Sequence, residues 1–519
     1  MSKIGAAGTG AMGRSARARV AIGLVTVVAA GCAGVGGDAE SSGEVVESAS
    51  QAASGKLSKL TFPNAFGVAA TFTDNKKITF KKDRILENAF FTSFGTNGRA
   101  CIHCHIPAEG WTISAAGVTA RFSRPLDVTN ADCVVNPSSC AAVPPAEAGK
   151  DPIFRLVDGA NSPLADISTA AAREAAFSML RTRGLIRVGI GIPAGADFTL
   201  AAVDDPYGYA SAAELSLFRR PLPSTNLRLS PGGKHDPAPS PTLTGVMWDG
   251  RASTPGQDVI TDLLDQSNGA TLGHAQAAAG LSTADRQAIV DFETGLHTAQ
   301  VSDLEAGALD ASGGQGGPEW LAKNQPFYVG INDVLTGDSR TGAPFNPDAF
   351  TVYSAWAGSA TAARARIARG QAVFNRKPIA ITGVGGLNDA LGAPTVAGTC
   401  TSCHDTPNFG HHSVPFPIDI GLTDGSRRTP DMPLYTLRNT ATGQTRQTTD
   451  PGRALVTGRW ADIGKFKGPI LRGLAARAPY FHNGLAATLE QVVDFYQTRF
   501  GIDLTSAEKS DLVAFLRAL

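Results

Sequence analysis

Two five-residue segments of the same pattern constrain this chain more than any other feature. They are Cys101-Ile-His-Cys-His105 and Cys400-Thr-Ser-Cys-His404, each of the form Cys-x-x-Cys-His. Two thiols at this spacing lie on one side of a single turn and can bond both vinyl groups of one porphyrin, while the next histidine faces the iron. We therefore predict two covalently bound c-type haems. Their attachment residues are Cys101, Cys104, Cys400 and Cys403, and the proximal iron ligands are His105 and His404.

Other uses of paired cysteines fit these pentads less well. A zinc ribbon closes its ligand set within a few tens of residues, and it does not need a histidine directly after the second cysteine. A thioredoxin-like redox pair needs a βαβ context, which is missing around both pentads. Covalent haem attachment is the preferred interpretation.

The first 32 residues resemble an export signal. Arginines precede an apolar run from Val20 to Ala30, which is too short to span a bilayer. Small residues before Cys32 resemble a lipoprotein cleavage site, with ordinary cleavage as the alternative. Residues 33–58, rich in Ser, Ala, Glu and Gly, are predicted to form a flexible tether. Since haem is attached to such pentads outside the cytoplasm in bacteria, we expect the protein to be located in the periplasm or cell envelope. We expect it to contact the membrane only through a lipid.

The remaining cysteines and the net charge narrow the chemistry further. Cys133 and Cys140 flank a short turn, and in an oxidising compartment this favours a disulfide over a metal site. The formal net charge is zero, so nothing indicates nucleic acid as a partner.

The two halves of the chain repeat each other. Residues 281–296 align without gaps on residues 504–519, and both segments start with a Ser/Thr cap and an acid in the first helical turn. Trp248 likewise aligns on His482. Further helices are predicted before each pentad, over residues 84–94 and 362–374. We expect a mainly α fold, with two cytochrome c-like haem domains related by an internal pseudo-repeat and long loop insertions.

The expected domain boundaries follow from this repeat. An N-terminal cytochrome c domain with an insertion covers residues 59–312, and an inter-domain insertion covers 313–360. A C-terminal cytochrome c domain covers 361–519. We expect the insertions to form loops and short helices over the haem domains.

Several segments together resemble the bacterial di-haem cytochrome c peroxidases and their MauG-type relatives. They are Trp248-Asp-Gly-Arg251, Asp450-Pro-Gly-Arg453, Lys465-Phe-Lys-Gly-Pro469 and Pro479-Tyr-Phe-His-Asn-Gly484. The resemblance covers roughly residues 80–110, 240–300 and 360–519, and the long insertions indicate an enlarged variant. It implies that the first haem binds peroxide, that the second stores or delivers electrons, and that Trp248 relays them. Core packing is the alternative role for Trp248. A calcium ion between the domains is also usual in the family.

Two departures concern the iron ligands. Arg121 stands where the peroxidases supply a histidine to cap the first iron, so this haem is expected to be open, as in the MauG type. His235 and His274 are alternative caps. Tyr496 stands where typical members have the methionine ligand of the second iron, and MauG-type enzymes use a tyrosine there. Met432 is the rival ligand, and a core position is the alternative for Tyr496.

A third departure concerns the group that moves a proton between the two peroxide oxygens. The family uses a glutamate about twenty residues after the tryptophan, and this position falls at Ser267 or Asn268 here. Asp262 aligns with Tyr496 in the repeat, which predicts a place near the open face of the first haem. The candidates for this role are Gln257, Asp262, Asp265 and His274.

The leading hypothesis for function is reduction of hydrogen peroxide, with electrons from a small periplasmic cytochrome or a cupredoxin. A first alternative is a MauG-type enzyme that oxidises a protein or organic substrate. A second alternative is a non-catalytic di-haem electron carrier.

Overall fold

A computed structural model describes residues 58–229, 246–252, 258–324, 327–414 and 416–519. Of these residues 31% are helical and 16% lie in strands or bridges. The expectation of a mainly α fold is therefore wrong. The expected signal segment with Cys32 lies outside the described residues, as do the tether up to residue 57, His235 and Gln257.

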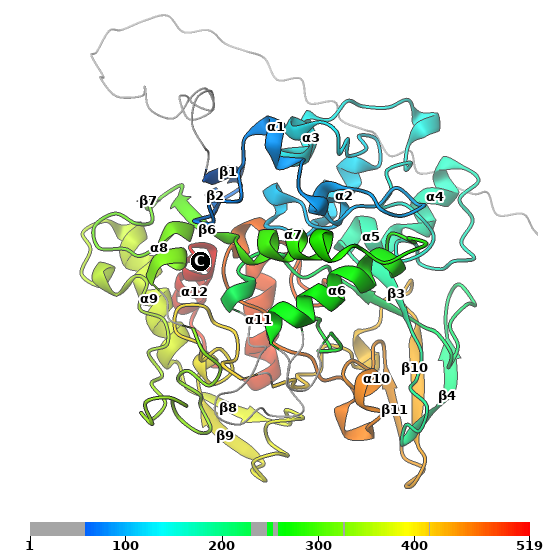
Figure 1. Ribbon diagram of the computed structural model, residues 1–519. Coiled ribbons are helices and arrows are strands. Elements are labelled where there is room, and N and C mark those ends of the chain that lie inside the picture. Colours follow the sequence, from blue (N-terminus) through cyan, green and yellow to red (C-terminus); the bar gives the residue numbers. More distant parts are fainter. Residues whose placement is uncertain (1–57, 230–245, 253–257, 325–326, 415) are drawn as a thin grey trace, which may run out of the picture. The chain divides into compact units, whose positions relative to one another are not determined.

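The described helices of the first 200 residues are short, and the longer helices α6, α7, α9, α11 and α12 come later in the chain (Figure 1). They are α1 (Lys82–Ile85), α2 (Ala115–Arg121), α3 (Ala131–Val135), α4 (Ala170–Ala176), α5 (Ser178–Arg183), α6 (Val259–Gly273), α7 (Thr283–Thr294), α8 (Pro318–Asn324), α9 (Ala362–Arg376), α10 (Ala454–Thr457), α11 (Leu489–Phe500) and α12 (Ser506–Arg517). In the described residues no helix is long and apolar enough to cross a membrane.

The two aligned closing segments are both helices, as predicted. Ser282 caps α7 by accepting the backbone N–H of Asp285. The Thr505 side chain caps α12 by accepting the backbone N–H of Glu508, and the Glu508 carboxylate accepts the backbone N–H of Thr505. The helix predicted over 362–374 is α9, which packs along α12 (Figure 1).

The prediction of a single helix over residues 84–94 is wrong. The segment contains only the end of α1 and a separate 3₁₀ turn, Ala89–Phe91. The Asn88 side chain accepts the N–H of Phe90 and so starts a new turn. Phe90 and Phe91 are both buried in the core, with their ring centroids 5.3 Å apart.

Strands fill much of what was expected to be loop. They are β1 (Lys59–Asn64), β2 (Gly67–Phe72), β3 (Ile186–Ile190), β4 (Phe198–Asp204), β5 (Leu215–Arg219), β6 (His297–Asp303), β7 (Gly307–Ala308), β8 (Ile379–Thr382), β9 (Thr395–Gly398), β10 (Leu434–Asn439) and β11 (Thr445–Thr448). They form sheets of order β1-β2-β6-β7, β11-β10-β4, β3-β5 and β8-β9, with antiparallel pairing.

The sheet β11-β10-β4 joins the insertion of the first half to the second half of the sequence. Phe198 of β4 lies opposite Asn439 of β10, with a register shift between Thr436 and Leu437. The residues that face inward in this region form an apolar cluster that includes Phe198, Leu215, Leu217, Tyr435 and Leu437. This alternation of apolar side chains has the two-residue period of a strand, which is why the region is not made of loops.

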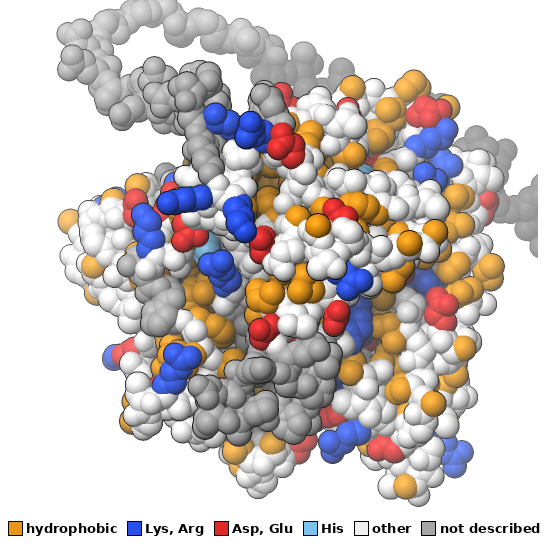
Figure 2. Space-filling view, in the orientation of Figure 1, with side chains coloured by type: hydrophobic (Ala, Val, Ile, Leu, Met, Phe, Trp, Pro, Cys, Tyr) orange, Lys and Arg blue, Asp and Glu red, His pale blue; other side chains and the backbone are white. Residues whose placement is uncertain are grey.

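The visible surface is mixed in charge. On the face drawn in Figure 2, the basic and acidic side chains of the described residues are interspersed. This agrees with a formal net charge of zero.

Candidate functional site

The first pentad forms a single turn that directs His105 toward a cavity. Cys101–His103 is a 3₁₀ turn, and the N–H of Cys104 returns to the carbonyl of Cys101. His105 Nδ1 lies 3.0 Å from the carbonyl oxygen of Trp111. This hydrogen bond fixes the ring and leaves Nε2 for iron. Burial lowers the pKa of His105 to about 4, so the imidazole is neutral, which is the form that binds metals.

The second pentad has the same construction. Cys400–Ser402 is again a 3₁₀ turn. His404 Nδ1 lies 2.5 Å from the carbonyl oxygen of Gly410, and burial lowers the pKa of His404 as well. Nε2 is again left for iron.

The aromatic surroundings of the two histidines also match. Phe90 lies 6.2 Å from His105 and 5.1 Å from Phe292, measured between ring centroids. Phe374 lies 5.9 Å from His404 and 5.7 Å from Phe515. Phe292 and Phe515 occupy the same position in the two aligned helices α7 and α12. The sequence repeat therefore corresponds to a repeated packing around each histidine.

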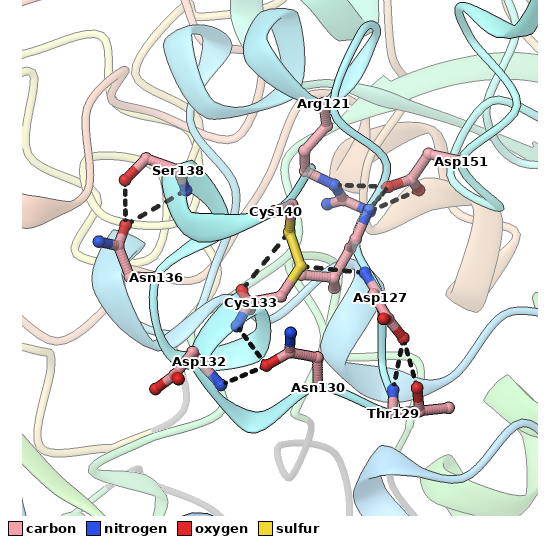
Figure 3. Close-up of a disulfide and its surroundings, with 11 residues drawn as sticks. Arg121, Asp127, Thr129, Asn130, Asp132, Cys133, Asn136, Ser138, Cys140 and Asp151 are labelled. Carbon is pink, nitrogen blue, oxygen red and sulfur yellow. Dashed lines mark hydrogen bonds and ion pairs between the residues drawn. A yellow bond between two sulfur atoms is a disulfide. The ribbon is translucent and has the colours of Figure 1, made fainter. Parts of the chain in front are cut away.

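Arg121 is hydrogen-bonded to the backbone of the first pentad. Its guanidinium forms a two-bond ion pair with Asp151, at 2.6 and 2.9 Å (Figure 3). It also donates to the carbonyl of His103 at 2.6 Å. Both side chains are buried. The residue that replaces the family's histidine thus holds the backbone of the pentad and lies outside the lining of the His105 cavity.

The predicted disulfide is present. Cys133 and Cys140 are bonded to each other in the loop that starts with α3, and Cys133 Sγ accepts the N–H of Asp127 (Figure 3). Among the described cysteines, those of the two pentads are free thiols.

Each pentad opens into its own apolar cavity. The first, called the His105 cavity, has about 1470 Å³ of empty space, part of it open to solvent, and is lined by Cys101, Cys104 and His105. The second, the His404 cavity, has about 1900 Å³ on the same measure and is lined by Cys400, Cys403 and His404. Two free thiols and a histidine with Nε2 available, at the edge of an apolar space of this size, fit a covalently attached haem.

The two cavities share a wall. Residues that line both are Pro221, Pro223, Lys467, Gly468 and Pro469. Trp248 lines the His404 cavity, while Val246 and Met247 line the His105 cavity. The Trp248 ring donates from Nε1 to the carbonyl of Arg220 at 2.7 Å, and its own carbonyl accepts the N–H of Lys467. Trp248 therefore stands at the boundary between the cavities.

The helix α6 covers the His105 cavity through its later turns. Leu263, Gln266, Ser267, Thr271 and the following His274 line this cavity. Ser267 is one of the two positions, with Asn268, at which the resembled family is expected to place its glutamate.

Three acid–base candidates meet in a chamber next to the His105 cavity. His274 lines both spaces, whereas Asp262 and Asp265 line only the neighbouring chamber, together with Arg251. Asp262 lies in this neighbouring chamber, and its expected place near the open face of the first haem stays a prediction.

His274 is held by a carboxylate that sequence reasoning missed. Its Nδ1 lies 2.7 Å from Asp158 Oδ2. Burial opposes ionisation of Asp158, but the hydrogen bond and charge of His274 outweigh it and lower the pKa of the carboxyl. The carbonyl of His274 also accepts from Asn97 and Arg99, just before the first pentad. Asp158 lies far from any motif in the sequence, so no local signal identifies it.

Glu293 is a second missed residue of the His105 cavity. Burial raises the pKa of its carboxyl to about 8, so it is largely neutral at pH 7. It aligns with Leu516, which lines the His404 cavity. An acid in place of a leucine at a repeat position is the signal that would have singled it out.

The two candidate ligands of the second iron lie in different places. Tyr496 of α11 lines the His404 cavity, where burial and then the thiols of Cys403 and Cys400 raise the pKa of its phenol. Met432 is buried in a separate cluster with Met179, Leu185 and Phe218. Tyr496, and not Met432, shares the cavity of His404.

Curated proteins match part of this chain. Cytochrome-c peroxidase IdrP2 of Denitromonas iodatirespirans is 36% identical over 138 residues, which are 24% of this chain and 37% of that protein. Cytochrome-c peroxidase IdrP1 of Pseudomonas sp. strain SCT is 32% identical over 140 residues, 23% of this chain and 36% of that protein. The chain is a relative of the bacterial cytochrome-c peroxidases. The resemblance seen in the sequence is thus confirmed.

Further comparisons define how far the similarity extends. Cytochrome c551 peroxidase of Nitrosomonas europaea is 34% identical over 121 residues, 23% of this chain and 30% of that protein. The matched stretch thus spans about a third of the length of these curated relatives. A solved MauG-like protein associated with microbial copper homeostasis aligns over 84% of this chain and 88% of its own, with 16% identity and a TM-score of 0.28. No protein-family model matches the chain. The peroxidase relatives imply covalently bound c-type haem as the cofactor.

Proposed function

We propose that this protein is a di-haem c-type oxidoreductase that reduces hydrogen peroxide at the His105 cavity with electrons delivered through the His404 cavity. One observation carries the proposal: each pentad opens into its own apolar cavity, and the two cavities share a wall that contains Lys467, whose backbone N–H is bonded to the carbonyl of Trp248. This shared wall is the proposed route of electron transfer between two haems. One haem is attached at Cys101 and Cys104, and the other at Cys400 and Cys403. The haem-bearing segments are proposed to belong to domains 59–312 and 361–519.

The two haems are proposed to have different tasks because their cavities differ in carboxyl groups. Asp158 and Glu293 line the His105 cavity, whereas the described lining of the His404 cavity has no Asp or Glu and has Leu516 at the repeat position of Glu293. When bound, haem supplies the iron that coordinates peroxide and passes on electrons. The overall reaction, H2O2 + 2 H⁺ + 2 e⁻ → 2 H2O, requires proton-handling side chains only where the peroxide is cleaved.

His274 is the best-supported acid–base residue. Asp158 accepts the Nδ1 proton, which leaves the lone pair of His274 Nε2 free to take a proton from one peroxide oxygen and return it to the other. The carboxylate also stabilises the imidazolium that forms in between, as an acid partner does for a catalytic histidine.

The electron donor is proposed to be a small periplasmic cytochrome or a cupredoxin, and the protein is proposed to work in the periplasm or cell envelope. A lipid on Cys32 and a calcium ion between the haem domains remain part of the proposal without assigned contacts.

A MauG-type enzyme, which oxidises a protein or organic substrate, is the second candidate function. The specific observation in its favour is Tyr496 in the His404 cavity, because a tyrosine ligand stabilises higher oxidation states of iron than methionine does. Turnover of peroxide with reduced small cytochromes as donors supports the peroxidase. Peroxide-dependent oxidation of a protein, with no activity toward such donors, supports the MauG type.

A steady-state assay of the holoprotein tests the proposal. Peroxide consumption with a reduced cytochrome or cupredoxin is expected in the wild type and lost in the variant Cys101→Ala/Cys104→Ala, which retains the second haem. A non-catalytic carrier would consume no peroxide in either protein, and neither of its haems would bind cyanide or carbon monoxide rapidly.

A further inference from the structure

Three buried side chains with metal-binding chemistry meet beside the second pentad. They are Asp333, Asp405 and His412, and one donor atom from each lies within 4.8 Å of the others. Their exposed fractions are 1%, 0% and 5%. Asp333 comes from the segment between α8 and α9, whereas Asp405 and His412 come from the loop that follows His404. The cluster therefore joins two segments that are about seventy residues apart in the sequence.

Among the described residues, no lysine or arginine forms an ion pair with either carboxylate of this cluster. Their ion-pair partner there is His412, whose Nδ1 lies 3.6 Å from Asp405 Oδ2. Two buried carboxyl groups in this position need either a proton or a cation.

The backbone holds the two carboxylates in fixed orientations. Oδ1 of Asp333 accepts the N–H groups of Leu335 and Thr336 at 3.0 and 2.7 Å. Its other oxygen, Oδ2, lies 3.5 Å from the hydroxyl oxygen of Ser413. Asp405 Oδ1 accepts the N–H of Ser413 at 2.6 Å. Asp405 Oδ2 accepts the N–H of Val334 and the hydroxyl of Ser413, both at 3.3 Å. The Ser413 hydroxyl thus lies beside Oδ2 of both carboxylates.

We propose that Asp333, Asp405 and His412 bind one first-row divalent cation, such as Zn²⁺ or Mn²⁺, in addition to any haem iron. Two carboxylate oxygens and an imidazole nitrogen are a donor set that suits these ions. Around a tetrahedral Zn²⁺, donors at about 2.0–2.1 Å from the ion lie roughly 3.4 Å from one another. Asp405 Oδ2 and His412 Nδ1 are 3.6 Å apart, close to this separation.

The ion would fix the loop that carries the second proximal histidine. Asp405 follows His404 directly, and Asn332, the neighbour of Asp333, donates to the carbonyl of Asp405 at 2.9 Å. Binding would clamp the segment between α8 and α9 to this loop. This inference does not depend on peroxidase activity.

Metal analysis of the haem-loaded protein tests the proposal. Wild-type protein stripped with EDTA is expected to take up one Mn²⁺ per chain, measured by loss of the free Mn²⁺ signal in EPR, and Zn²⁺ should compete for it. The variant Asp333→Asn should bind Mn²⁺ at least about tenfold more weakly. The melting temperature of the wild type should fall on stripping and recover on refilling, while Asp333→Asn should show no such response.

The matched control is Asp338→Asn. Asp338 lies in the same segment and accepts from Tyr328 and Thr341, but it is not part of the cluster. This variant should lose stability and keep the Mn²⁺ site. Absence of Mn²⁺ and Zn²⁺ uptake by stripped wild-type protein overturns the proposal, even if Asp333→Asn does not fold. Equal uptake by the wild type and Asp333→Asn also overturns it.

Discussion

Trp248 and His482 pack edge to face, with ring centroids 6.1 Å apart. These two residues occupy the same position in the two halves of the sequence repeat. His482 in turn stacks on Phe466 at 3.9 Å, and all three side chains line the His404 cavity. The equivalent residues of the two halves therefore meet at the wall between the cavities, where electrons are proposed to cross.

Replacing Trp248 with Phe should slow electron transfer between the haems. The change removes the indole that lies at the boundary and its hydrogen bond to the carbonyl of Arg220. We expect the transfer rate, measured by rapid mixing of the half-reduced protein with peroxide, to fall by about tenfold or more, equivalent to ~1.4 kcal/mol. Haem content should not change. The variant Trp460→Phe, which alters a tryptophan outside both cavities, should transfer electrons at the wild-type rate.

Replacing His274 with Gln should impair peroxide cleavage. Loss of an acid–base residue costs about 10²- to 10⁴-fold in rate, and we expect kcat/KM for peroxide to fall within this range. Asp158→Asn should have a smaller effect in the same direction, since the amide keeps a hydrogen bond but not the charge. Cyanide binding and haem content serve as readouts that do not depend on turnover, and haem content should be normal in both variants.

The control for His274 is Asp265→Asn, which changes the adjoining chamber only. We expect less than about a tenfold loss in this variant. An unchanged kcat/KM in His274→Gln, or an equal loss in Asp265→Asn, would contradict the role assigned to His274.

Replacing Tyr496 with Phe tests the ligand of the second iron. If the phenol binds this iron, its removal should eliminate the tyrosinate charge-transfer absorption and raise the midpoint potential, on the order of 100 mV within the ~0.8 V range set by axial ligands. Tyr480→Phe is the matched control, because Tyr480 lines the same cavity but donates its hydroxyl to the carbonyl of Leu474 at 2.9 Å. Identical spectra of Tyr496→Phe and the wild type would rule out ligation.

Glu293 should make the stability of the protein depend on pH. Burial raises the pKa of this carboxyl from 4.5 to about 8 in the folded state. Between these values the folded protein holds a proton that the unfolded chain has released, so the free energy of unfolding falls as pH rises, by at most about 1.4 kcal/mol per pH unit from this group. Below pH 4.5 the carboxyl is protonated in both states, so this destabilisation is absent. Above about pH 8 it is complete and no longer changes with pH.

Denaturant unfolding of Glu293→Gln from pH 4.5 to 8 measures this effect. The variant should lose less stability than the wild type over this range, whereas the exposed Glu147→Gln should follow the wild type. Parallel curves for all three proteins would show that Glu293 is not neutral in the folded state.

The features predicted well from the sequence are those set by local patterns. The caps at Ser282 and Thr505 start two helices, and the pair Cys133 and Cys140 forms a disulfide, because each depends on residues close in the chain. The gapless alignment of Phe292 on Phe515 also survives as equivalent packing against Phe90 and Phe374.

The features missed depend on contacts between distant segments. The pairing of β4 with β10 joins strands more than 200 residues apart, and nothing near Phe198 reveals its partner. Asp158 reaches His274 across 116 residues.

The most direct test of the central claim is stopped-flow mixing of the reduced holoprotein with hydrogen peroxide, followed by absorbance at wavelengths that separate the two haems. The account predicts that the haem attached at Cys101 and Cys104 reacts first, that the haem attached at Cys400 and Cys403 is oxidised afterwards, and that Trp248→Phe delays only the second phase. Both haems remaining unchanged while peroxide is not consumed would contradict it.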